Sequence, residues 1–118
     1  MNYTLTIVKN RYDNKIPWLR INSNILDDFE KKCSEKKIDT SDVIRKFVYD
    51  VNKNKLNIND FGIKFFSNFD TKLTQVRIES DEWNEFKKTC VLTGIKPSDV
   101  LRNFISEVSK GNIKIVIQ

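Results

Sequence analysis

An internal repeat constrains the fold of this chain more than any other feature of its sequence. When the numbers of the first-half residues are raised by 57, the two halves align without a gap and many residues coincide. The identical pairs include Arg20/Arg77, Ile21/Ile78, Ser23/Ser80, Phe29/Phe86, Cys33/Cys90, Ile38/Ile95, Ser41/Ser98, Asp42/Asp99, Val43/Val100, Arg45/Arg102, Phe47/Phe104, Val51/Val108 and Ile58/Ile115. A match of this length in one register indicates two copies of a single structural unit. We therefore expect both halves to form the same elements, related by an approximate two-fold axis.

The length of the chain limits how the two copies can fold. With 118 residues, it suits one compact domain or two small intertwined units. A unit of about 50 residues buries little apolar surface alone, which predicts that the copies share one hydrophobic core. We assign the first repeat to residues 1–59, with its core at 16–52, and the second to residues 60–118, with its core at 73–109.

Charge and composition restrict the function. The chain has 21 Lys and Arg against 16 Asp and Glu, and the net charge of +5 favours an acidic partner. It has no His, which is the commonest general base. The sequence shows no nucleophile–base pair, glycine-rich phosphate loop or prominent carboxylate dyad. We predict that the protein is not an enzyme and holds no cofactor or metal.

The two cysteines and the hydropathy pattern indicate the compartment. Cys33 and Cys90 occupy equivalent apolar positions, so we interpret them as small buried hydrophobes rather than metal ligands or redox sensors. We find no apolar run long enough to span a bilayer and no signal peptide. These features predict a cytoplasmic protein without a membrane partner.

The hydrophobic periodicity predicts strand–strand–helix–helix–strand in each half. Residues 3–8 alternate as a strand, and residues 16–21 form a second one. A helix that Asn22 or Ser23 caps follows, and then a second helix with Asp39 as its N-cap. The apolar residues expected to face the core are Leu19, Ile21, Leu26, Phe29, Cys33, Val43, Ile44, Phe47, Val48 and Val51 in the first half, and Val76, Ile78, Trp83, Phe86, Cys90, Val100, Leu101, Phe104, Ile105 and Val108 in the second.

The connection between the halves is predicted to be a hairpin. Residues 56–58 and 63–66 would be its strands, with the turn at residues 59–62. In the second half, a strand at residues 73–78 precedes the two helices, and residues 113–117 form a final strand. The approximate two-fold axis would give the hairpin a counterpart, in which the N-terminal strand lies beside the C-terminal one.

Each repeat resembles the ribbon-helix-helix (MetJ/Arc) family of DNA-binding proteins. The resemblance in the second copy rests on Val76-Arg77-Ile78, on the helix with Trp83, Phe86 and Cys90, and on the run Gly94-Ile95-Lys96-Pro97-Ser98-Asp99-Val100-Leu101-Arg102. The first copy fits through Leu19-Arg20-Ile21 and Ile38-Asp39-Thr40-Ser41-Asp42-Val43-Ile44-Arg45, with Lys37 where the family favours Gly. The resemblance implies an α+β fold, a tandem ribbon-helix-helix pseudo-dimer with additional short flanking β-strands.

The family pairs one strand from each of two units into an antiparallel ribbon that lies in the major groove. In this chain the resemblance implies that residues 16–21 pair with residues 73–78. Its outward side chains, Trp18, Arg20, Gln75 and Arg77, would then contact bases, with Ile16 and Leu73 at the edges. An arginine fork suits guanine, and a glutamine amide can read adenine.

The same resemblance assigns the starts of the second helices to DNA phosphates. The residues implied are Thr40 and Ser41 in the first repeat, and Lys96 and Ser98 in the second. Backbone amides at a helix start attract anions. Lys96 strengthens this interpretation in the second repeat, whereas Asp39 weakens it in the first. Arg45 and Arg102 are expected to pair with a carboxylate or a helix end instead of DNA.

The predicted function is sequence-specific binding of double-stranded DNA, as a transcriptional repressor or a plasmid or phage accessory factor. One chain would cover one half-site, so two or more chains would associate on the DNA. The alternative is a protein–protein interaction module, antitoxin-like or inhibitor-like, that keeps the fold without reading DNA. Arg20, Gln75 and Arg77 exposed together would favour DNA, and a covered ribbon with Trp18 and Leu73 buried would favour a protein partner.

Overall fold

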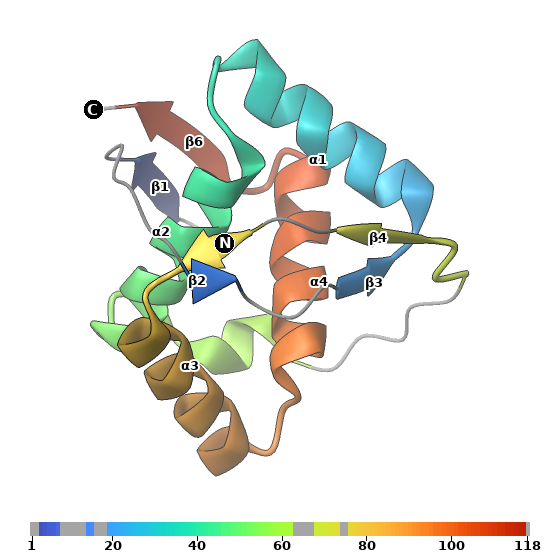
Figure 1. Cartoon of the computed structure of the whole chain (residues 1–118). Coiled ribbons are helices and arrows are strands. Elements are labelled where there is room, and N and C mark those ends of the chain that lie inside the picture. The colour runs from blue at the N-terminus through green and yellow to red at the C-terminus, as the bar shows by residue number, and fades with distance from the viewer. Residues whose placement is uncertain (1–2, 8–13, 16–18, 63–67, 74–75, 118) are drawn as a thin grey trace.

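The computed structural model describes residues 3–7, 14–15, 19–62, 68–73 and 76–117, and within them the chain is α+β (Figure 1). The helices are α1 (Ser23–Glu35), α2 (Thr40–Asn52), the 3-10 helix η1 (Ile58–Phe61), α3 (Ser80–Thr93) and α4 (Pro97–Ser109). The strands are β1 (Thr4–Ile7), β2 (Asn14–Lys15), β3 (Leu19–Ile21), β4 (Thr71–Leu73), β5 (Arg77–Ile78) and β6 (Lys114–Ile117). The predicted helix pairs of both repeats are therefore confirmed.

The first helix of each repeat packs on the second helix of the other. Helix α1 lies against α4 and α2 lies against α3, and Figure 1 shows the first pair as the blue-to-cyan and orange-red ribbons. The equivalent residues Phe47 and Phe104 stack on each other at the centre, with ring centroids 4.0 Å apart and planes inclined by 15°. A single buried cluster contains residues from both halves. The two repeats consequently contribute to one hydrophobic core.

The residues predicted to face this core are buried, with one exception. All of the apolar residues named for the two repeats are buried except Trp83, which is half-buried and stacks on Phe86 with ring centroids 5.4 Å apart. Burial of one such side chain stabilises the fold by about 1.5–3 kcal/mol. The stripes on α2 and α4 are wide because each of these helices also contacts the first helix of its own repeat.

Two antiparallel ladders join the halves. Leu19, Arg20 and Ile21 pair with Leu73, Lys72 and Thr71, and Asn14 and Lys15 pair with Ile78 and Arg77. Both ladders follow one register. Lys15 lies four residues before Leu19, and its partner Arg77 lies four residues after Leu73, the partner of Leu19. The predicted antiparallel pairing of residues 16–21 with 73–78 is seen directly in Leu19 and Leu73, and the other described pairs extend the same register to residues 14–15 and 71–72, outside the predicted strands. Positions 16–18 and 74–75, which include Ile16, Trp18 and Gln75, lie outside the described residues.

One orientation in this pairing differs from the prediction. Leu73 was expected at the outward edge, but it is buried, with 8% of its surface exposed. The reason is its pairing with Leu19, because directly opposed residues of an antiparallel ladder share a face. Leu73 therefore belongs to the hydrophobic core.

The terminal strands pair as predicted, but the prediction of a connecting hairpin is wrong. Strand β1 lies parallel to β6, with Leu5 opposite Ile115 and both buried. Residues 58–61 form η1 instead of a hairpin turn, and residues 63–66 lie outside the described part. The Asn57 side chain accepts a hydrogen bond from the amide of Asn59 at 3.0 Å, a local bond that competes with strand pairing.

The turns that end the helices repeat across the two halves. Lys37 and its equivalent Gly94 both have left-handed backbones, with φ of 55° and 73°. The amides of the next residues, Ile38 and Ile95, bond to the carbonyls of Cys33 and Cys90 at 3.1 Å. This is the six-to-one bond that closes a helix at a left-handed residue. A lysine there is strained, because its Cβ crowds the backbone where glycine has none.

Lys37→Gly should raise the free energy of unfolding by up to about 1 kcal/mol, since it relieves the left-handed strain. Urea unfolding at neutral pH measures this difference. The matched control is Lys36→Gly. Lys36 has a φ of −94° and no left-handed strain, so its replacement by glycine should lower the free energy of unfolding. Equal destabilisation by both variants would contradict the shared helix-ending geometry.

Candidate nucleic-acid interface

The ribbon presents one exposed arginine from each repeat. Arg20 lies on β3 and Arg77 on β5, and both are exposed while their neighbours Ile21 and Ile78 are buried. Arg20 is paired with Lys72 of the second repeat, which is also exposed. The residue paired with Arg77 is Lys15 of the first repeat. The two ladders thus place basic residues of both repeats in equivalent arrangements.

The backbone of each exposed arginine is held by an arginine from the other repeat. Arg102 on α4 donates through Nε to the Arg20 carbonyl at 2.8 Å, and Arg45 on α2 donates to the Arg77 carbonyl at 2.7 Å. Each of these helix arginines also pairs with the aspartate three residues earlier. Arg102 lies 3.0 Å from Asp99, and Arg45 contacts Asp42 in the same way. The expectation that Arg45 and Arg102 pair with carboxylates is confirmed.

The partners of Arg45 and Arg102 determine what these two helix arginines do at the site. Their charges are engaged by carboxylates and carbonyls, so their role is to position the strands. The side chains of Arg20 and Arg77 are exposed, and Arg20 makes a long hydrogen bond, 3.4 Å, to the Phe69 carbonyl. The Phe69 ring in turn lies 4.3 Å from the Arg102 guanidinium carbon.

Next to Arg20 the surface forms an open depression of about 360 Å³, lined by Arg20, Asp70, Thr71 and Lys72. The Asp70 carboxylate accepts two hydrogen bonds from Ser23, one from its amide at 2.8 Å and one from its hydroxyl at 2.9 Å. These bonds, the amide bond first, lower the pKa of Asp70. Asp70 therefore caps the start of α1 from the other repeat, together with Asn22, whose side chain accepts from the amides of Asn24 and Ile25.

The starts of α2 and α4 lie at equivalent places in the two repeats. Their N-cap residues are Asp39 and Lys96, and neither side chain makes a capping hydrogen bond. Lys96 is exposed, and Thr40, Ser41 and Ser98 are half-buried. The two helix starts differ in charge, because a carboxylate stands at one and an ammonium at the other.

The predicted contact residues are thus partly located. Arg20 and Arg77 lie on the paired strands, and the four predicted phosphate contacts stand at the helix starts, whereas Trp18 and Gln75 lie outside the described residues. Sequence reasoning missed Lys72, because the predicted strand began at residue 73 and β4 begins at Thr71. The signal available was the repeat itself, which aligns Lys72 with Lys15.

The cysteines take no part in this surface. Cys33 and Cys90 are buried, as predicted, and their burial raises the pKa of the thiols to about 12 and about 11. Thiolate, the reactive and metal-binding form, is consequently scarce at neutral pH.

Comparisons with protein-family models, with curated proteins and with solved structures found no match for this chain. Among the helices of the described residues, none has the length and apolar character needed to cross a membrane.

Asp70→Asn should destabilise the protein at neutral pH and lose this effect in acid. The lowered pKa means that the folded state favours the ionised carboxylate. Its contribution is therefore complete above the pKa of the unfolded chain and disappears as the pH falls through the folded-state value. Urea unfolding of wild type and variant at pH 7 and pH 2.5 checks this (roughly the limits of aspartate titration). An equal stability difference at both pH values would rule out the ionised cap.

Proposed function

We propose that this protein binds double-stranded DNA in a sequence-specific manner through an antiparallel ribbon that both halves of one chain supply. The observation that carries the proposal is the pair of exposed arginines, Arg20 and Arg77, held in equivalent positions on strands of opposite repeats. An exposed side chain on a backbone anchored from behind is suited to contact a groove. The ribbon would lie in the major groove, as in ribbon-helix-helix proteins.

The arrangement of the repeats supports a tandem ribbon-helix-helix pseudo-dimer. A strand and two helices recur in each half, and each half's helices pack on those of the other. The reciprocal hydrogen bonds from Arg45 and Arg102, and the stacked pair of Phe47 and Phe104, join residues related by the same shift of 57. In this proposal one chain does what two identical chains do in the family.

The chemistry of the proposed contacts separates base reading from positioning. Each arginine fork would bond the O6 and N7 atoms of a guanine, and a good bidentate pair contributes about 1–3 kcal/mol of discrimination. Lys72 and the helix starts at Thr40, Ser41 and Ser98 would hold phosphates, which set the register of the protein on the duplex. Affinity would then fall steeply as salt is added, because phosphate contacts release counterions.

The two ends of the proposed interface are not equivalent. Lys96 adds positive charge at the start of α4, whereas Asp39 adds negative charge at the start of α2. We infer that the second repeat holds its flanking phosphates more tightly than the first. One chain would cover one half-site, and two or more chains would occupy a repeated operator, as expected of a repressor or a plasmid or phage accessory factor.

The proposal predicts that the chain selects a sequence motif from pooled random duplex DNA at moderate salt. Arg20→Ala/Arg77→Ala should abolish the motif, because it removes both base-reading forks while leaving the carbonyl anchors in place. The matched control is Lys87→Ala/Lys88→Ala on the exposed side of α3, which removes the same charge and should retain the motif. Motif-free binding that the arginine variant leaves unchanged would refute base reading.

A protein-binding module remains the second candidate, and one observation favours it. Val91 and Leu92, near the end of α3, are exposed by 75% and 78%, an unusual pair for a surface. The buried Leu73 does not add to this, since it faces the core beside Leu19 rather than a cover over the ribbon. Failure of the duplex selection would favour this second function.

A further inference from the structure

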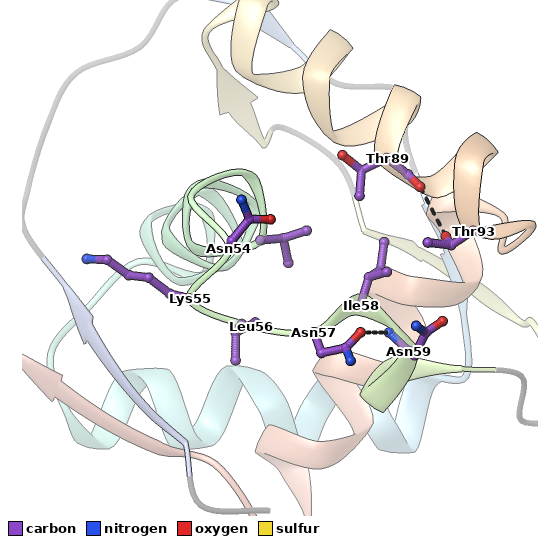
Figure 2. Close-up of a pocket in the computed structure, with 9 residues that line it drawn as sticks. Asn54, Lys55, Leu56, Asn57, Ile58, Asn59, Thr89 and Thr93 are labelled. Carbon is purple, nitrogen blue, oxygen red and sulfur yellow. Dashed lines mark hydrogen bonds between the residues drawn. The ribbon is translucent and has the colours of Figure 1, made fainter.

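The duplication has produced two surface grooves with equivalent walls. One, the linker groove, lies between the end of α3 and residues 54–59, and has a volume of about 370 Å³. Figure 2 shows Thr89 and Thr93 of α3 on one side of it and the linker side chains, among them Asn57 and Ile58, on the other. The other, the β6 groove, lies between the end of α1 and residues 111–116, and measures about 380 Å³. Nearly all lining positions of the two grooves are related by the shift of 57.

The β6 groove follows the edge of a strand. It is lined by Ile113, just before the strand, and by three consecutive β6 residues, Lys114, Ile115 and Val116. Successive side chains of a strand point to opposite faces, so a groove lined by all three strand residues runs along the strand's edge. Within the described part of the chain, β6 pairs only with β1. The backbone groups of its other edge are therefore placed to accept an added strand.

Three positions on the rim of the β6 groove are lysines, and the equivalent positions of the linker groove are uncharged. Lys32 and Lys36 on α1 and Lys114 on β6 are exposed, and no ion pair among the described residues engages them. The equivalent residues of the linker groove are Thr89, Thr93 and Asn57. Each rim also has one further charge, Glu35 beside the three lysines and Lys55 in the linker groove.

We propose that the β6 groove binds an extended peptide segment, in which acidic and apolar residues alternate, as a strand added to the edge of β6. Acidic side chains would meet the three lysines, and apolar ones would cover Val116, which is 44% exposed. A second copy of this chain is a poor occupant, because its β6 would bring a further Lys114 against the lysine rim. Charge complementarity thus selects an acidic partner.

The test uses the full chain and a fluorescein-labelled ten-residue peptide that alternates glutamate with valine, followed by fluorescence anisotropy without DNA. Lys32→Thr/Lys36→Thr/Lys114→Asn gives the β6 groove the residues found at the equivalent positions of the linker groove, and should weaken peptide binding at least 10-fold. Thr89→Lys/Thr93→Lys transfers two lysines to the linker groove and should add no second binding site, because residues 58–61 form η1 there and offer no strand edge. Urea unfolding of each variant verifies that the fold is retained.

Three results would overturn the proposal. The first is equal peptide affinity for wild type and the triple lysine variant. The second is equal affinity for a peptide with glutamine in place of glutamate, or for one with alternate backbone amides methylated, since these changes remove charge pairing and strand pairing. The third is a triple variant that keeps its peptide affinity and loses duplex affinity as far as Arg20→Ala/Arg77→Ala does, which would assign the lysines to DNA phosphate. Because the peptide assay contains no DNA, it is independent of the proposed base reading.

Discussion

The architecture depends on a reciprocal pair of hydrogen bonds between the halves, from Arg45 to the Arg77 carbonyl and from Arg102 to the Arg20 carbonyl. A buried guanidinium is costly unless carboxylates and carbonyls surround it, and Arg45 is only 8% exposed. Separation of the halves would remove the Arg77 carbonyl from the Arg45 guanidinium, and would free the strand backbone from its anchor. The bonds therefore tie the integrity of the core to the position of the exposed arginines.

The connection between the halves is where the repeat symmetry fails, and the failure has a geometric cause. Strand β6 pairs in parallel with β1, which comes from the far end of the chain. The equivalent residues 57–60 run directly into the next repeat, and neighbouring segments of a chain cannot pair in parallel without a long crossover. They form η1 instead, and Phe61 enters the core against Phe47 and Phe104, with ring centroids 4.9 and 6.3 Å away. Two equivalent grooves thereby acquired different edges.

Much of this fold could be predicted because the information is local. Helical spacing marked Phe29 and Phe86 as core residues, and Asn22 carried a recognisable capping preference. The orientation of Leu73 could not be derived in this way, because it depends on a partner, Leu19, far away in the sequence. For the candidate site, residue type and repeat predicted the exposed arginines, whereas the carbonyl anchors require knowledge of how the repeats interlock.

An NMR titration of the labelled chain with duplex DNA tests whether the shared ribbon is the DNA-binding face. If the ribbon binds DNA, the largest shifts fall on the amides of residues 19–21, 71–73 and 77–78, with smaller ones at Ser41 and Ser98. The amides of Val91 and Leu92, at the end of α3, should remain unshifted. Shifts centred on Val91 and Leu92, with the ribbon amides unmoved, would show that the ribbon is not the DNA-binding face.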